Sequence, residues 1–357
     1  LMKFYSLILK IYSFFLREFS CFILKKTYHL NPHALKYVVK CFPFINIEKE
    51  LITNLENAIC LSKLSVFSQQ LYCPIKSLCV SNPSCFNVKE NIYVVYTIHN
   101  HKTSASRRFN YTDNLGSSRI GFGMSLITSD GQQLDLGTAN IEEKQNYSIL
   151  CDFRCLALSS AVLISCSIST VDNTHRIGWC LVPFDQLTHG PSKWIFCIEN
   201  SPFDYQTEKN WMPISTGDDK FKFVYRPEGH HLDSMIEKKE INPKNLLIFP
   251  NSQNFTKKAG GSPFLKFDGK FLACIHQTYL KPYRNYVHFF TLGNWLSIDK
   301  FETFINKSSF FFFEPFDSEF CGGMCEIDDF IIFSVGFRNS EGWLLKIKSS
   351  DIKDLLE

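Results

Sequence analysis

The sequence contains no Cys-x-x-Cys pair, although it has 14 cysteines. Cys321 and Cys325 are flanked by glycine and methionine rather than by further ligand side chains, so we predict no metal site. Many of the cysteines stand singly in apolar runs, where a free thiol acts as a small buried hydrophobic group. Free thiols are typical of a reducing compartment, which favours a cytoplasmic location. Four Asn-x-Ser/Thr sequons point the other way, but so short a motif often occurs by chance.

Long basic runs are also absent, and the formal net charge of the 357 residues is only +3. The basic stripe of a nucleic-acid-binding protein is therefore missing, and no nucleic-acid partner is expected. The sequence has no glycine-rich phosphate loop of the Rossmann or Walker kind either. It therefore lacks a recognisable nucleotide-binding motif, and we predict no cofactor.

An uninterrupted apolar run of membrane-spanning length is a further absence. Residues 4–24 are rich in Phe, Leu, Ile and Tyr, but Lys10, Arg17 and Glu18 interrupt them. The unbroken centre and small-residue cleavage site of a signal peptide are missing too, which leaves at most a poor signal-anchor. An amphipathic helix fits this segment better. Two placements of that helix stay open, packing on the body of the protein and peripheral contact with a membrane surface.

Phenylalanine is abundant, with 35 residues, and many lie in short runs such as 310–313 that favour β-strands. Up to about residue 78, apolar residues recur at helical spacing, as at Leu51, Ile52 and Leu55. Beyond that point, apolar runs of five to eight residues alternate with polar turns, which is typical of an all-β domain. We therefore predict a small, mostly helical N-terminal extension over 1–78 and a β domain over 79–357.

Five segments of the β part share one pattern, in which a polar or glycine-containing opening leads to an apolar stretch, a polar turn and a second apolar stretch. The openings are Asn82-Pro83-Ser84, Asp152-Phe153-Arg154, 208–211, 260–263 and 319–323, and they recur every 50 to 70 residues. That spacing is the length of a four-stranded blade with long loops. Because one hairpin cannot bury its own faces, we predict a five-bladed β-propeller. A two-sheet sandwich would use about seven to nine strands, too few for this pattern.

Polar side chains of the openings should meet at one mouth of the central channel, because the loops into the innermost strands gather there. Carboxylates, amides and cations beside an aromatic ring suit a sugar, which needs directional hydrogen bonds and an apolar face. Lys209 next to Trp211 is not needed for packing, which favours a binding role for this pair. The openings and strand ends supply the candidates Asn82, Asp152, Arg154, Glu208, Lys209, Asn210, Trp211, Arg226, Ser262, His276 and Glu319.

The order of these motifs resembles glycoside hydrolase family 130, the β-mannoside phosphorylases and mannosidases, over about 270 residues. The motifs that carry the resemblance are Asn82-Pro83-Ser84, Ser118-Arg119-Ile120-Gly121, Ser129-Asp130-Gly131, Asp152-Phe153-Arg154, Glu208-Lys209-Asn210, Tyr225-Arg226, Gly261-Ser262-Pro263, 271–276, and Glu319-Phe320 with Gly336. The resemblance implies a five-bladed propeller with Asp152 as general acid toward the glycosidic oxygen. It adds Arg119 to the substrate-binding candidates.

The same resemblance implies that Arg154, Lys209, Arg226 and His276 lie near a phosphate or a second charged group. Related propeller glycosyltransferases use a sugar nucleotide or sugar phosphate as donor and a glycan as acceptor, so we expect partners of this kind. The mannose-type sugars of the family are the expected substrates.

Three positions depart from the family pattern. Cys151 replaces a glutamate, Phe153 a proline, and Asn339 an aspartate. With one plausible acid, hydrolysis by two carboxylates is less favoured than phosphorolysis or transfer, which need one acid and a cationic clamp. The alternative is a non-catalytic glycan-binding or scaffold propeller. In that interpretation Asp152 caps a turn, while Arg154 and His276 have structural roles.

Overall fold

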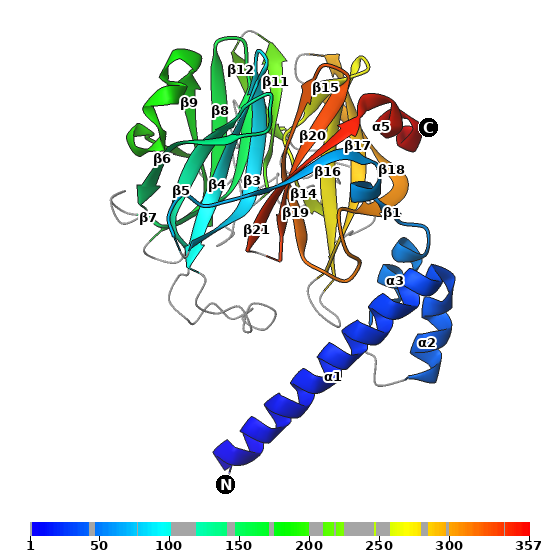
Figure 1. Ribbon diagram of the computed structural model, residues 1–357. Helices are drawn as coiled ribbons and strands as arrows, with labels where there is room; N and C mark the ends of the chain where they lie inside the picture. Colours follow the sequence, from blue (N-terminus) through cyan, green and yellow to red (C-terminus); the bar gives the residue numbers. More distant parts are fainter. Residues whose placement is uncertain are drawn as a thin grey trace, which may run out of the picture.

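The computed structural model describes the backbone of residues 2–42, 47–76, 78–100, 119–140, 147–170, 175–199, 210–217, 219–224, 246–247, 258–279, 285–297, 300–338 and 340–357. These residues are mostly β, with helices at the N-terminal end of the chain (Figure 1). The predicted change from a helical beginning to a β-rich remainder is therefore confirmed.

Three α-helices come first, α1 (Met2–Leu30), α2 (Leu35–Cys41) and α3 (Lys49–Glu56). The C-terminal half of α1 buries Cys21, Leu24 and Tyr28 in a cluster with apolar residues of α2, α3 and the sheets, while its N-terminal half projects away from the body (Figure 1). A last helix, α5 (Ser349–Leu356), buries Ile352. None of the helices described combines the length and apolarity needed to cross a bilayer.

The strands of the described residues form five sheets, one after another along the chain. The first contains β3 (Leu78–Val88), β4 (Asn91–Asn100), β5 (Arg119–Ile127) and β6 (Gln133–Asn140). The second contains β7 (Tyr147–Ala157), β8 (Ala161–Thr170), β9 (His175–Pro183) and β10 (Cys197–Glu199). The third contains β11 (Met212–Gly217), β12 (Lys220–Val224) and β13 (Leu246–Leu247).

The two remaining sheets each recruit a strand from the N-terminal part of the chain. The fourth contains β14 (Lys258–Gly260), β15 (Leu265–Phe267), β16 (Lys270–Tyr279), β17 (Asn285–Ser297), β18 (Lys300–Phe311) and β1 (Ile59–Cys60). The fifth contains β19 (Glu319–Ile327), β20 (Phe330–Phe337), β21 (Glu341–Lys348) and β2 (Ser65–Leu71). Short 3₁₀ helices are η1 (Pro32–Ala34), η2 (Leu61–Lys63), η3 (Phe184–His189) and η4 (Pro191–Lys193).

Residues 59–71 differ from the helical extension that we predicted over 1–78. The α-helices before the sheets end at Glu56, β1 pairs in parallel with β18, and β2 pairs antiparallel with β21 with one irregularity after Ser65. Without β2, strand β21 would be an open sheet edge with unpaired backbone groups. Residues 65–71 do not show the regular alternation of apolar and polar residues that predicts a strand. The helical spacing of the preceding residues therefore decided the prediction.

The first strands of the five sheets contact one another in a closed ring. On β3, the Ser84 hydroxyl donates to the Gly322 carbonyl of β19 (3.0 Å) and accepts from the Cys155 N–H of β7 (2.8 Å). The Phe264 N–H, just before β15, donates to the Pro213 carbonyl of β11 (2.9 Å). The ring is completed by Arg154 of β7, which binds Asn210 before β11, and by a contact between Ser262 and Met324 of β19.

A bulge recurs at the same place in the first strands. The register shifts between Ser81 and Ser84 in β3, between Cys151 and Arg154 in β7, and between Cys321 and Gly323 in β19. Asn82 (φ 45°) and Asp152 (φ 55°) have left-handed backbone in the bulges of β3 and β7, and so does Asn210 (φ 65°) just before β11. Asn and Asp tolerate this conformation better than most residues. The openings read from the sequence therefore correspond to a structural repeat.

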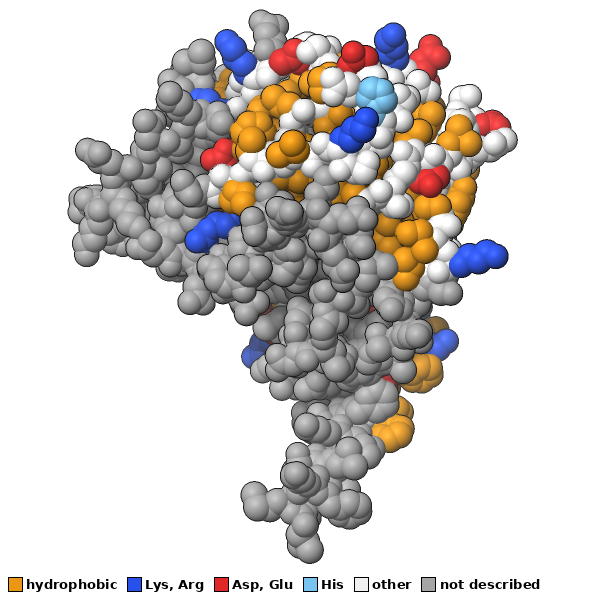
Figure 2. All heavy atoms as spheres, turned by 90° about the vertical axis from the view of Figure 1, so that its left-hand side faces the viewer, with side chains coloured by type: hydrophobic (Ala, Val, Ile, Leu, Met, Phe, Trp, Pro, Cys, Tyr) orange, Lys and Arg blue, Asp and Glu red, His pale blue; other side chains and the backbone are white. Residues whose placement is uncertain are grey.

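The outer surface of the body carries scattered apolar side chains. Figure 2 shows them on the face that includes β6 and β9, between charged and polar groups. Leu134, Ile195 and Ile198 are 44%, 82% and 42% exposed. Scattered exposed apolar residues are normal on soluble proteins.

Candidate functional site

Four of the predicted site residues meet on the inner ring. The Asn82 amide donates to Asp152 Oδ1 over 2.7 Å, which links β3 to β7. Arg154 Nη2 donates to Asn210 Oδ1 over 2.8 Å, which links β7 to the residue before β11. The sequence analysis expected this convergence, because the residues hold equivalent places in the repeat.

Asp152 lies at the centre of this group and is half-buried. Its left-handed backbone lies in the bulge of β7, and its carbonyl accepts a 2.8 Å bond from Arg154 Nη1. The carboxylate and the backbone are thus each held by a neighbouring side chain. A carboxylate held in this way is suitable as a general acid or base, since proton transfer requires a set geometry.

Arg154 is fully buried and binds three segments from different sheets. In addition to the Asp152 carbonyl and Asn210, its Nε donates to the Gly261 carbonyl over 2.7 Å. Its guanidinium also lies 5.3 Å from the centroid of the Phe320 ring. Burial lowers the pKa of Arg154 to about 10, and the nearby Asp152 opposes that change, so the side chain stays charged at neutral pH. These contacts with main-chain and amide oxygens indicate the structural role that the alternative interpretation gave to Arg154.

The Asn82 side chain packs on Gly336, another residue of the family-like motifs. A Cβ at Gly336 would lie 2.4 Å from Asn82 Oδ1, much closer than real contacts allow. Glycine is therefore required at 336 because the β3 bulge approaches β20 so closely. The sequence motifs included Gly336, but they did not indicate that a close contact with Asn82 requires glycine there.

Trp211 lies in the hydrophobic core. The residue is 3% exposed, its ring centroid lies 5.8 Å from that of Phe223, and it belongs to a cluster with Leu163 and Ile177. The sequence interpretation that a tryptophan beside Lys209 is not needed for packing was therefore incorrect. The interior between the second and third sheets needs a large ring that local sequence does not reveal.

Ser262 and Glu319 are buried and bind the backbone. Ser262 Oγ accepts from the Cys274 N–H over 2.9 Å. The Glu319 carboxylate accepts from three consecutive N–H groups, those of Phe312 (2.5 Å), Phe313 (2.7 Å) and Glu314 (2.9 Å). Burial raises the pKa of Glu319 to about 8, although these three donors act in the opposite direction. Both side chains thus hold the segments that lead into β15 and β19.

His276 is buried in an aromatic environment next to a second histidine. Its ring lies 4.8 Å from Tyr286, 5.5 Å from Phe320 and 6.3 Å from His288, its cross-strand partner. Burial lowers the pKa of His288 to about 3, so His288 is neutral. These contacts match the core role that the sequence analysis left open for His276. His288 itself was not predicted, because nothing in its local sequence marks it.

Several candidates lie outside the described residues. Glu208, Lys209 and Arg226 belong to ranges that the structure does not describe, and Arg119 is described only as the first backbone position of β5. The expected anion clamp of Lys209, Arg226 and His276 therefore remains a prediction. Among the residues that are described, no group of three His, Cys, Asp or Glu side chains is arranged to hold a metal ion.

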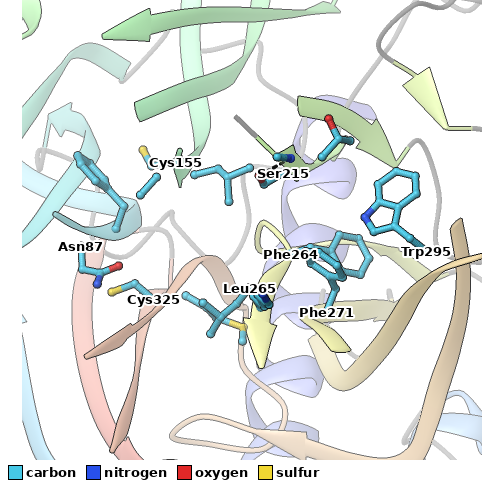
Figure 3. A pocket seen from close by; sticks show the side chains of 15 residues that line it. Asn87, Cys155, Ser215, Phe264, Leu265, Phe271, Trp295 and Cys325 are labelled. Atoms are coloured by element: carbon cyan, nitrogen blue, oxygen red, sulfur yellow. Dashed lines mark hydrogen bonds between the residues drawn. The ribbon is translucent and has the colours of Figure 1, made fainter. Parts of the chain in front are cut away.

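A cavity of about 500 Å³ lies at the other end of the ring, toward the tight turns (Figure 3). The first strands of all five sheets line it, as shown by Asn87, Cys155, Ser215, Leu265 and Cys325. Phe264, Phe271 and Trp295 give one wall an aromatic character. The sequence did not indicate this cavity, because its lining residues are ordinary strand residues.

Comparisons with known proteins identify the fold. No family model matches the sequence, and no curated protein matches it. A β-1,2-mannobiose phosphorylase from Listeria innocua superposes with a TM-score of 0.50 at 10% identity, over 80% of this chain and 95% of that chain. A mannose phosphorylase from Leishmania mexicana gives a TM-score of 0.49 at 12% identity, over 81% and 90%. A family 43 β-xylosidase/α-arabinofuranosidase from a compost metagenome gives 0.47 at 8%, over 78% and 95%.

The chain is thus similar in structure to the family 130 mannoside phosphorylases and to the family 43 five-bladed propeller glycosidases. The resemblance stated from the sequence motifs is confirmed at the level of the fold. At such low identity the similarity shows the fold alone.

Proposed function

We propose that the protein is a five-bladed β-propeller that acts on mannose-type sugars as a glycoside phosphorylase or glycosyltransferase, with Asp152 as general acid/base. The observation that carries this proposal is the hydrogen-bond network on the inner ring. There Asn82 and Arg154 bind Asp152, whose backbone is left-handed in the bulge of β7. The five sheets, the closed ring of first strands and the similarity to the Listeria phosphorylase support the propeller.

The chemistry needs one acid and one anion site. In phosphorolysis a phosphate oxygen attacks the anomeric carbon, the glycosidic C–O bond breaks, and the leaving oxygen takes the proton of Asp152. In glycosyl transfer the acceptor oxygen attacks the anomeric carbon, the anomeric C–O bond to the donor phosphate breaks and that phosphate leaves, while the same carboxylate accepts the proton of the acceptor hydroxyl. Since Arg154 binds the main chain, Lys209 and Arg226 are the cations proposed to face the phosphate. Solved relatives in complex with β-1,2-mannobiose and with phosphate suggest these two compounds as first probes.

A second candidate function is non-catalytic glycan binding. It is favoured by the structural use of Arg154, Ser262 and Glu319, three residues expected to line the pocket. If all such residues have structural roles, the site would keep the amides and the carboxylate that bind a sugar. It would lack the cations that hold the phosphate during turnover.

Asp152→Asn tests the proposed acid. The wild-type protein is incubated with β-1,2-mannobiose and inorganic phosphate, and mannose release is measured; a panel of sugar phosphates and sugar nucleotides with mannose acceptors covers transfer. The variant keeps an oxygen for the Asn82 bond and tolerates the left-handed backbone, so binding measured by calorimetry should change little. Turnover should fall by about two to four orders of magnitude.

Asp328→Asn is the matched control, because Asp328 also has left-handed backbone (φ 51°) but lies in the turn between β19 and β20. It should keep wild-type turnover. More than about a tenth of wild-type turnover in Asp152→Asn would exclude Asp152 as the general acid. Sugar binding without turnover of any donor in the panel would support the glycan-binding candidate instead.

A further inference from the structure

Helix α1 exposes a row of phenylalanines on the side that points away from the body. Phe15, Phe19 and Phe22 are 63%, 52% and 58% exposed, and their spacing of four and three residues places them on one face of the helix. Apolar and basic side chains are visible on the described part of this projecting region in Figure 2. In the sequence, Phe4, Ile8 and Ile11 precede this row at the same spacing.

The opposite face of α1 fixes the helix to the body. Cys21, Leu24 and Tyr28 are buried there, and they lie about half a helical turn away from the phenylalanine row. Lys25 Nζ forms a 2.5 Å ion pair with the buried Asp317, which also pairs with Arg338. The phenylalanine row is therefore held outward by a fixed helix.

Charge is distributed unevenly between this region and the rest of the chain. Residues 1–47 contain seven Lys or Arg and a single acidic residue, Glu18, so their formal charge is +6. The whole chain carries +3, so residues 48–357 carry −3. Lys26 Nζ lies 5.9 Å from the centroid of the Phe22 ring, at the end of the exposed row. The basic charge is thus concentrated where the apolar row is.

We propose that α1 binds the surface of an anionic lipid bilayer, with Phe15, Phe19 and Phe22 inserted between the headgroups and the basic side chains close to the lipid charges. Exposed aromatic side chains on one helix face together with a local positive charge are the features that such interfacial helices share. The net negative body would be repelled by the same lipids, so the attraction must come from residues 1–47. This proposal is independent of the proposed function.

A second copy of the chain suits this helix less well. Pairing two α1 helices through their phenylalanine rows would bring two regions of charge +6 together, and like charges at close range oppose association. Anionic lipid instead neutralises that charge while it buries the apolar row. The charge distribution therefore selects the bilayer.

Vesicle sedimentation of the full chain tests the proposal. The purified protein is mixed with vesicles of phosphatidylcholine alone or with 30% phosphatidylserine, at about 0.1 M and 0.5 M salt, where screening is weak and strong. We expect at least a tenfold larger bound fraction with the anionic vesicles at low salt and a clear fall at high salt. The triple substitution of Phe15, Phe19 and Phe22 by serine should lower vesicle affinity at least tenfold.

The matched control replaces Leu134, Ile195 and Ile198 by serine, three exposed apolar residues of the β-rich body, and should bind vesicles like the wild type. Circular dichroism and thermal unfolding of each variant check that the fold is kept, which the exposure of all six side chains favours. Equal binding to neutral and anionic vesicles, or equal loss in both triple variants, would overturn the proposal. So would a dimer, seen by analytical ultracentrifugation, that the phenylalanine substitutions dissolve while no vesicle binding is found.

Discussion

At the scale of single residues, Arg154 is the side chain that connects three segments of the inner ring through hydrogen bonds. It is only 1% exposed and donates to oxygens before β11, after β14 and within β7. Removing a buried charged group that satisfies several partners leaves those partners without donors. Arg154 therefore stabilises the ring of first strands, although the sequence analysis also allowed it to be a phosphate ligand.

Arg154→Met should lower the free energy of unfolding by about 3–5 kcal/mol, because carbonyl and amide oxygens stay buried without a donor. Arg154→Lys should recover only part of this, since an ammonium cannot reproduce the planar fork. Urea denaturation measures both. Arg338→Met, which removes a half-exposed partner of Asp317, should cost about 1 kcal/mol or less. Equal losses at 154 and 338 would contradict the role given to Arg154.

His288 predicts a dependence of stability on pH. Its pKa is about 3 in the folded protein, below its ordinary value of 6.5, because it is buried. Below pH 6.5 the unfolded chain takes up a proton that the folded protein does not, so stability falls as the pH drops from 6.5 toward 3. Glu319, with a pKa near 8, has the opposite effect, since its contribution falls as the pH rises from 4.5 to 8.

His288→Phe isolates the histidine, because a planar aromatic ring is kept and the proton site is removed. As the pH falls below 6, the wild type should lose unfolding free energy relative to this variant by up to about 1.4 kcal/mol per pH unit. Chemical denaturation at pH 7, 6, 5 and 4 gives that difference. A difference that is constant over this range would show that His288 titrates normally in the folded protein.

At the scale of elements, the bulges bring neighbouring first strands unusually close. A Cβ at Gly322 would lie 2.4 Å from the Pro83 carbonyl oxygen, both of them backbone positions in the bulges of β19 and β3. Side-chain rearrangement cannot relieve such a contact, so the strands would have to separate. Glycine at 322 thus sets the distance between the first and fifth sheets.

Gly322→Ala should therefore lower the unfolding free energy by more than about 2 kcal/mol, as backbone shifts in a packed interior do. Gly269→Ala is the comparison, because its φ of +74° is unfavourable to alanine while no atom lies within 4 Å of the new Cβ. It should cost about 1 kcal/mol. Thermal unfolding of the two variants ranks them, and the reverse order would refute the close approach at 322.

The sequence predicted those elements whose signal is local and repeated. Asn82, Asp152 and Asn210 could be brought together because each stands at the opening of a repeat unit. The burial of Trp211 and Ser262 could not be foreseen, since Trp211 packs with Leu163 and Ile177 and Ser262 contacts Met324, all of them far away in the sequence. The same limit hid β2, whose residues become a strand only because β21, about 270 residues later, has an edge to pair.

At the scale of the whole molecule, β2 joins the N-terminal part of the chain to the C-terminal sheet. An outermost strand usually opens easily and loses the protection of its amides. Here, opening β2 would also detach the chain that connects α3 to β3. We expect the amides of β2 and β21 to exchange with deuterium at rates within about tenfold of each other. Much faster exchange in β2 would show that the strand opens by itself.

The pairing of β2 with β21 also has a consequence during synthesis. When Leu71 has been made, its partner residues do not yet exist, and about 270 more residues must be added before β21 is complete. At ribosomal rates of about 5–20 residues per second, β2 waits for roughly 15 to 50 s. During that time the nascent chain carries an unpaired strand that includes Val66 and Phe67, a segment that chaperones would recognise. The fifth sheet is therefore the last to form on the ribosome, however early its outer strand appears.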